Sequence, residues 1–209
     1  MPLPPTAPEA PVSKTQAQRS AMVLTAARWL PQRGMSAVNL IEVARAVDAP
    51  RGSIYHYFPG GRDQLLQEAL ALASQSGLRM IEKAARAAAT PQGFIRSLFA
   101  AGARQINNAD FSGGCPVGAA VLSSETENAA FQHALQQSFA QWEAAIAQSF
   151  TALGVVPKSH TKKLAHCALI AYEGALVCAK GARDEKLFAQ AASMVEAMLE
   201  RSEGKSFHF

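Results

Sequence analysis

Residues 51–57 (RGSIYHY) concentrate side chains that can bind nucleic acid. A guanidinium, a hydroxyl, an imidazole and two phenols lie within this short segment, on Arg51, Ser53, His56, Tyr55 and Tyr57. Such groups donate hydrogen bonds to phosphate oxygens and to base edges in the grooves of DNA. The alternative is an amphipathic helix with a solvated polar face, but solvated faces usually carry Lys and Glu. The residue types therefore favour a DNA-contacting segment.

The residues before this segment predict a helix that ends just ahead of it. One apolar helix face, at spacings i, i+3, i+4 and i+7, is formed by Leu40, Val43, Ala44 and Val47. Ser36 or Asn39 can cap its start. Asp48, Ala49 and Pro50 break this helix. Pro50 suits the first turn of a following helix.

Residues 50–58 are expected to form that second helix. Ile54 and Phe58, four residues apart, would face inward and leave the polar side chains outside. Gly52 would let the backbone approach a phosphate or another helix closely. Two helices joined by a tight turn form a helix-turn-helix, which lays its second helix in the major groove of DNA.

From about Met22 to Leu66 the chain resembles the TetR family of transcriptional regulators. The resemblance rests on AARWLPQRG and IEVARAVDAPRGSIYHYFPGGRDQLL, with GSIYHYF as its most specific part. The PGGR form at 59–62 and GGCPVG at 113–118 are similar to the LmrA/YxaF-like subgroup. The resemblance implies a homodimeric repressor with a small-molecule pocket in a larger helical C-terminal domain.

The chain departs from the usual family pattern at two positions. Asp48 stands where Gly is usual in the turn, and Asp tolerates the left-handed conformation that the resemblance implies there. Val38 stands where Thr is usual, which leaves Asn39 as the polar contact there. Arg62 is expected to bind a phosphate together with the N-terminal N–H groups of the next helix. The expected DNA-binding set is Asn39, Arg51, Gly52, Ser53, Tyr55, His56, Tyr57 and Arg62.

Alanine-rich helical periodicity from residue 14 onward predicts an all-α fold of about nine helices. We expect a disordered arm over 1–13, a three-helix DNA-binding domain over 14–62, and a ligand-binding and dimerisation domain over 63–209. Pro31 should kink or end the first helix near Leu30. A long helix over about 63–83 should connect the two domains.

The formal charge is concentrated at the DNA-binding end. Residues 1–62 contain 7 basic and 3 acidic residues, a net charge of +4, whereas 63–209 contain 13 of each. Phosphate neutralisation requires this placement. No apolar run approaches the roughly 20 residues that span a bilayer, and the first residues lack the basic start and apolar core of a signal peptide. We therefore expect a cytoplasmic protein that does not bind membranes.

Aromatic residues at helical spacing in the second domain are ordinary core in most cases, but several can line an apolar cavity. Because this domain has no net charge to attract a highly charged ligand, we expect a small apolar or aromatic effector. The expected lining is Phe94, Leu98, Gln105, Val121, Phe139, Trp142 and Tyr172, with Asn108 and Glu173 as further polar anchors. The resemblance implies that ligand binding releases DNA, with the connecting helix as the lever.

A homodimer is expected because a single recognition helix makes too few contacts for tight specific binding to a palindromic operator. The last two helices are the expected interface. Their small or apolar faces are Leu164, Ala168, Ala171, Tyr172, Ala175 and Ala179, and Leu187, Ala191, Met194, Val195, Met198 and Leu199. The alternative is that both faces pack within one chain.

Cys115 in GGCPVG offers a different chemistry. A thiol at a helix N-terminus can have a lowered pKa, which would suit a thiol-sensing regulator, or a small enzyme with His166 as base. We favour a small buried residue at a loop-to-helix junction, because an enzyme leaves the helix-turn-helix and the localised charge unexplained. Three cysteines and the observed histidine spacing predict no disulfide framework, metal site or cofactor.

Overall fold

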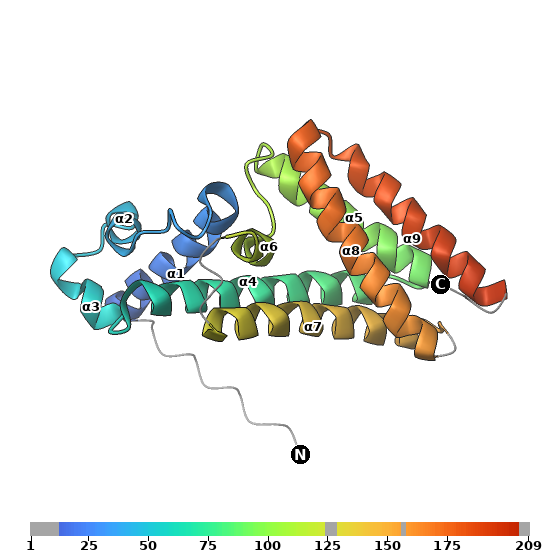
Figure 1. The fold of residues 1–209 in the computed structure, drawn as a ribbon, viewed down its shortest axis with the longest axis horizontal. Helices are drawn as coiled ribbons and strands as arrows, with labels where there is room; N and C mark the ends of the chain where they lie inside the picture. The colour runs from blue at the N-terminus through green and yellow to red at the C-terminus, as the bar shows by residue number, and fades with distance from the viewer. Residues whose placement is uncertain (1–12, 124–128, 156–157, 205–209) are drawn as a thin grey trace, which may run out of the picture.

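The computed structural model describes residues 13–123, 129–155 and 158–204, and within these ranges the chain is all α-helical, as expected. Figure 1 shows the small N-terminal helices at one end of the molecule and the last helices at the other. The first group comprises α1 (Lys14–Arg33), α2 (Leu40–Ala46), the 3-10 helix η1 (Arg51–Ser53) and α3 (Ile54–Tyr57). The second comprises α4 (Gly61–Arg86), α5 (Pro91–Asn108), α6 (Pro116–Val121), α7 (Ala129–Ala152), α8 (Lys158–Ala182) and α9 (Lys186–Gly204).

Helix α1 is one turn longer than the sequence predicts at its C-terminal end. Ser13 caps its start by accepting a hydrogen bond from the Gln16 backbone N–H. Pro31 lies inside the helix, which continues to Arg33 instead of ending near Leu30. Gly34 then ends the helix with φ 79°, and its N–H bonds to the Leu30 carbonyl at 3.0 Å.

The turn after α2 has the conformation that its sequence predicts. Asn39 caps α2, and its side-chain oxygen accepts bonds from the N–H groups of Ile41 at 2.8 Å and Glu42 at 3.3 Å. Asp48 has φ 53°, the left-handed conformation expected of it. The Ala49 N–H bonds back to the Ala44 carbonyl at 2.9 Å and closes the turn.

Helix α4 runs from the N-terminal helices into the second group as one continuous element (Figure 1). It is longer than predicted and ends at Arg86. Near its start it packs on α1 through fully buried Leu65 and Leu66, and further along it lies beside α7. The expected domain boundary between residues 62 and 63 falls in its first turn, and of the expected disordered arm, residues 1–12 lie outside the described residues.

Helices α5, α8 and α9 form a second layer against α4 and α7. Their shared core contains aromatic rings that meet edge to face, with centroids 5.6 Å apart for fully buried Phe94 and Phe150 and 5.5 Å apart for partly buried Tyr172 and fully buried Phe188. The short helix α6 fits between α1, α4 and α7.

The closest contact between α4 and α7 depends on a glycine. A Cβ at Gly77 would lie 2.6–2.7 Å from the Trp142 indole. The indole has little freedom to retreat, because its Nε1–H donates to the Ser74 carbonyl at 2.9 Å and its ring packs edge to face on Phe139. The absence of a side chain at position 77 therefore sets the distance between these helices.

We predict that Gly77→Ala destabilises the fold by on the order of 1–3 kcal/mol, because overpacking outweighs the gain in helix propensity. Gly181→Ala is the matched control, since an added Cβ there meets nothing within 4 Å. The control should unfold at the same temperature as the parent or higher. Thermal unfolding followed by circular dichroism measures both, and equal melting temperatures for the two variants would contradict the packing argument.

Candidate nucleic-acid interface and internal cavity

The outer face of η1 and α3 carries the side chains that the sequence assigns to DNA. Arg51, Tyr55 and His56 are exposed, with Tyr55 at 69 %, while Ser53 is partly buried. Ile54 and Phe58 are buried on the inner face, as their spacing predicts. The element is shorter than expected, since a 3-10 turn replaces the first part of the predicted helix.

Side chains of α1 fix η1 and α3 in place on their inner side. The Arg19 Nε–H donates to the Tyr57 carbonyl at 3.1 Å, and the guanidinium lies 5.0 Å from the centroid of the Phe58 ring. Nη2 of the same residue pairs with Glu68 of α4 at 2.5 Å. One side chain thus joins α1, α3 and α4. Sequence reasoning missed it, because its partners lie 38 and 49 positions away.

Tyr57 faces the interior, unlike the other polar residues of the segment. Its ring is buried, and its hydroxyl donates to the Gln18 Oε1 at 2.9 Å. Gln18 in turn donates to the Asp48 carbonyl at 3.4 Å. In this conformation the Tyr57 hydroxyl helps to position α3 on α1, and the expected contact of Tyr57 with the DNA backbone stays a prediction.

Arg62 also has a different place from the one expected. Its Nε–H donates to the Val38 carbonyl at 2.8 Å, and Nη2 donates to the Met35 carbonyl at 2.5 Å. These bonds direct the guanidinium toward the loop before α2. Arg62 therefore has a structural role in this conformation, and its expected phosphate contact stays a prediction. Asn39 is exposed and uses its side-chain oxygen on the α2 cap, which leaves its amide N–H groups for an external acceptor.

Arg45 is an exposed cation that the sequence-based set omits. It lies in the last turn of α2, outside the apolar face of that helix. In the described part of the chain, neither Arg45 nor Arg51 has an ion-pair partner. A guanidinium of this kind is available to a phosphate.

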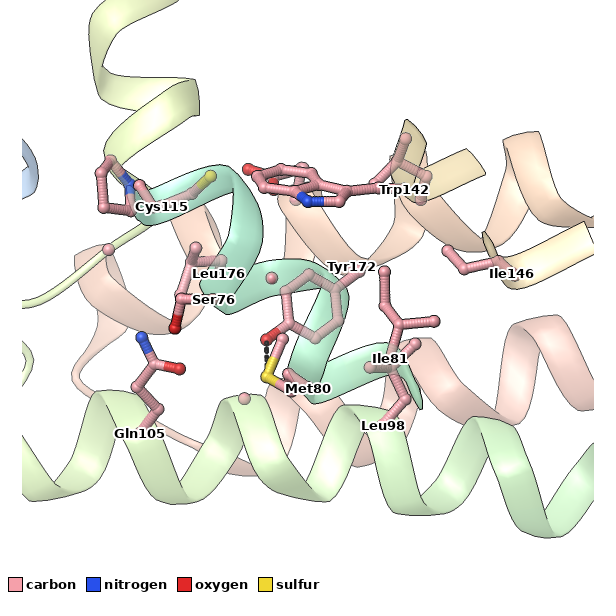
Figure 2. A pocket seen from close by; sticks show the side chains of 17 residues that line it. Ser76, Met80, Ile81, Leu98, Gln105, Cys115, Trp142, Ile146, Tyr172 and Leu176 are labelled. Atoms are coloured by element: carbon pink, nitrogen blue, oxygen red, sulfur yellow. Dashed lines mark hydrogen bonds between the residues drawn. The ribbon is translucent and has the colours of Figure 1, made fainter. Parts of the chain in front are cut away.

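A separate cavity of about 160 Å³ lies in the second group of helices (Figure 2). Its lining comes from α4, α5, α7 and α8 and from the loop that leads into α6. Trp142 and Tyr172 supply aromatic surface, and the Tyr172 hydroxyl reaches Met80 Sδ at 3.6 Å, the dashed contact in Figure 2. A thioether is a weak acceptor, so this hydroxyl retains the capacity to donate to a ligand.

The cavity contains part of the predicted lining. Leu98, Gln105, Trp142 and Tyr172 border it, together with Glu173. Phe94 does not, because its ring packs against Phe150 in the core. Further lining residues that the sequence did not single out include Ser76, Met80, Gly102, Leu169 and Leu176.

Val121 and Phe139 border a second, more open groove of about 1000 Å³, and Asn108 borders neither space. The groove lies between the end of α1 and helices α6 and α8, with Pro31 and Lys180 among its lining residues. Gly114, Cys115, Glu173 and Leu176 border both the groove and the cavity, so they form a common wall.

Two family models match this chain. Residues 23–69 match the bacterial regulatory proteins of the tetR family, and 91–194 match the C-terminal domain of LmrA/YxaF-like transcriptional regulators. An uncharacterized HTH-type transcriptional regulator of Mycobacterium tuberculosis is 34% identical over 174 residues, which cover 81% of this chain and 87% of the relative. The chain belongs to the TetR family of transcriptional regulators. The helix-turn-helix therefore lies in the DNA-binding domain of a TetR-family fold, and the cavity lies in its C-terminal domain.

Solved structures of TetR-family proteins have the same fold. A TetR regulatory protein from Rhodobacter sphaeroides superposes with a TM-score of 0.75 at 22% identity, over 85% of this chain and 96% of that one. A cysteine mutant of the TetR-family regulator CifR, bound to 26-base-pair operator DNA, superposes with a TM-score of 0.72 at 20% identity, over 93% and 98% of the two chains.

The common wall of this TetR-family protein contains a half-buried thiol, Cys115, that stays protonated. Burial and the adjacent Glu173 carboxylate raise the pKa of Cys115 well above that of a free thiol, although the Gly118 and Val117 N–H groups oppose them. Burial also raises the pKa of Glu173, and the hydrogen bond from Cys115 lowers it. A raised pKa removes the thiolate that a sensor or nucleophile needs.

The enzyme alternative also fails on geometry. His166 is exposed and pairs with Glu143 at 3.1 Å, and it does not border the cavity that contains Cys115.

Within the described residues, no group of three or more His, Cys, Asp or Glu side chains could hold a metal ion. None of the described helices is both long and apolar enough to span a bilayer.

We predict that Cys115 resists thiol reagents in the folded protein. In a variant with Ser at positions 167 and 178, reaction with iodoacetamide should be at least about tenfold slower folded than unfolded, because each unit of raised pKa removes about tenfold of the thiolate. Mass spectrometry of the Cys115 peptide at timed intervals measures the rate. If Cys115 reacted as fast in the folded as in the unfolded protein, the result would favour the thiol-sensing alternative.

Proposed function

We propose that this chain is a dimeric repressor that binds a palindromic operator and is released by a small aromatic effector. The observation that carries the proposal is the exposed set Arg51, Tyr55 and His56 on an element fixed to α1 by Arg19 and Tyr57. A rigid backing suits sequence reading, because base contacts require side chains in defined positions. A cytoplasmic location follows from DNA as the partner.

Gly52 supports the assignment of this face to DNA. An added Cβ there would meet nothing within 4 Å, and its φ is not in the left-handed region, so the chain's own fold does not require glycine. Close approach of the backbone to an external phosphate gives glycine a use. Arg51, Arg45 and the amide of Asn39 can bind phosphates beside it, while Tyr55 and His56 reach base edges.

The proposed dimer face lies on α8 and α9. Several residues of the expected faces are instead buried within the chain: Leu164, Ala168, Ala175, Ala179, Val195 and Leu199. The apolar side chains left outside are Ile170 at 59 %, Val177 at 63 % and Met194 at 62 % exposure. Gly174 lies between the first two on α8, and a Cβ there would meet nothing. A second copy packed on this face would cover all three exposed residues.

Contacts beside the common wall connect the cavity to the DNA-binding helices. Lys180 of α8 donates to the Pro31 carbonyl of α1 at 2.8 Å and to the Ser112 carbonyl at 3.5 Å. A Cβ on Gly114 would lie 3.2 Å from Pro31 Cβ. A ligand that moves this loop or α8 therefore moves the end of α1. The thiol-sensing alternative has weaker support, because the raised pKa of Cys115 keeps the thiol protonated.

We predict that Arg51→Ala and Tyr55→Ala weaken DNA binding in different ways. Arg51→Ala should reduce the slope of log affinity against log salt by about one unit on all sequences, because it removes a phosphate contact. Tyr55→Ala should cost about 1–3 kcal/mol on an operator selected by the parent protein and less on random DNA.

Fluorescence anisotropy at several salt concentrations measures both quantities. Arg86→Ala is the control, since Arg86 is exposed at the far end of α4 and its loss should change neither. If folded Arg51→Ala and Tyr55→Ala variants bound operator like the parent, the assignment of this face to DNA would fail.

We predict that Val177→Glu converts the dimer to a folded monomer, because it introduces two symmetry-related charges into an apolar interface. Leu24→Glu, at an exposed apolar position of α1, should remain dimeric. Light scattering coupled to size exclusion at micromolar concentration measures the mass. A monomeric parent would contradict the proposed dimer. A Val177→Glu variant that stays dimeric would show that α8 is not in the interface.

A further inference from the structure

The cavity contains one charged side chain among the described residues that line it, Glu173 of α8. Its carboxylate accepts a hydrogen bond from the Cys115 thiol. It also lies against α6, where a Cβ on Gly118 would approach Glu173 Oε2 to 3.0 Å. In the ranges that the structure describes, no Lys, Arg or His forms an ion pair with it.

The basic residue among those that line the neighbouring groove, Lys180, is bound elsewhere. Lys180 borders the groove on the other side of the common wall, but its ammonium donates to the carbonyls of Pro31 and Ser112. Glu173 is thus a largely buried carboxyl group whose charge no side chain balances. A buried carboxylate is costly without a cation, and burial raises its pKa. A cation that enters the cavity would offset this cost.

Aromatic surface for the same ligand lies beside the carboxylate. Trp142 and Tyr172 border the cavity, with Leu98, Ile146 and Leu176 as apolar neighbours (Figure 2). An aromatic ring can stack on these side chains, and an ammonium group is attracted to their faces as well as to Glu173. The size of the cavity sets a limit on the ligand. A cavity of about 150 Å³ holds one benzene ring in a model protein, so about 160 Å³ suits one ring with a short substituent.

We propose that the cavity selects a small aromatic monocation, a single ring that carries one protonated amine on a short chain. The ammonium group binds Glu173, and the ring packs between Trp142 and Tyr172. This proposal rests on the proposed function, because it names the chemical class of the effector. It also narrows the expectation of an apolar ligand: the domain as a whole is neutral, but the cavity has one negative group.

The test compares two probes of the same shape, 2-phenylethylamine and 2-phenylethanol, by calorimetric titration into the full chain. The parent should bind the amine about tenfold more tightly or better. Glu173→Gln should lose this preference while it retains affinity for the alcohol, because the amide still accepts the Cys115 hydrogen bond. Glu173→Asp, which keeps the charge, should retain part of the preference.

Glu143→Gln is the matched control, because Glu143 lies on α7 outside the cavity lining and should leave the preference unchanged. Equal affinities of the parent for the two probes, or no binding of the amine, would overturn the proposal. So would a preference that persists in Glu173→Gln.

Operator release measured with the same probes separates this inference from the proposed function. Binding of the amine through Glu173 without release of DNA would support the ligand class and refute induction. Equal release by both probes would support induction and refute the ligand class.

Discussion

The continuity of α4 is the constraint on which the rest of the structure depends. One helix from Gly61 to Arg86 is buried against α1 at its start and against α7 beyond it. Its contact with α7 is close, because Trp142 bonds to the Ser74 carbonyl and its ring occupies the space above Gly77. An unbroken helix transmits displacement along its length. The position of α3 is therefore tied to packing around the cavity through Glu68, which Arg19 joins to the Tyr57 carbonyl.

A second connection reaches the DNA-binding helices at a different point. Lys180 holds the end of α1 from α8, whereas α4 packs along the side of the same helix. A change that moves α8 relative to α4 would therefore alter the tilt of α1. An effector shifts the balance between two such arrangements only by the difference in its affinity for them. Contacts with the common wall are better placed to produce that difference than contacts with the Phe94–Phe150 core, which lies outside the cavity.

Local patterns in the sequence predicted the features that depend on neighbours in sequence. Helical spacing separated buried Ile54 and Phe58 from exposed Tyr55 and His56. The family resemblance located the turn in which Asp48 is left-handed. Hydrogen bonds between residues far apart in the sequence could not be predicted from such local patterns. Tyr57 bonds to a residue 39 positions away and Arg62 to carbonyls 24 and 27 positions away.

The same distinction applies to the cavity. Five of its lining residues were predicted by type: Leu98, Gln105, Trp142, Tyr172 and Glu173. Phe94 has the same type and helical spacing as a lining residue, yet it packs in the core. Helical periodicity identifies which face of a helix is buried, but not whether that face meets another side chain or a space. Only the packing of α5 against α7 decides this, and that depends on contacts between distant parts of the chain.

The sequence GGCPVG illustrates how burial can reverse the chemistry that a motif suggests. The Gly118 N–H donates to Cys115 Sγ at 3.2 Å, as expected at the start of a helix, and this bond lowers the thiol pKa. Burial and Glu173 have the larger opposite effect, so the thiol stays protonated and donates to the carboxyl group. Cys115 therefore acts as a neutral hydrogen-bonding link between the cap of α6 and α8. The glycine at 118 leaves room for the carboxylate, and the motif builds the wall between cavity and groove instead of a reactive centre.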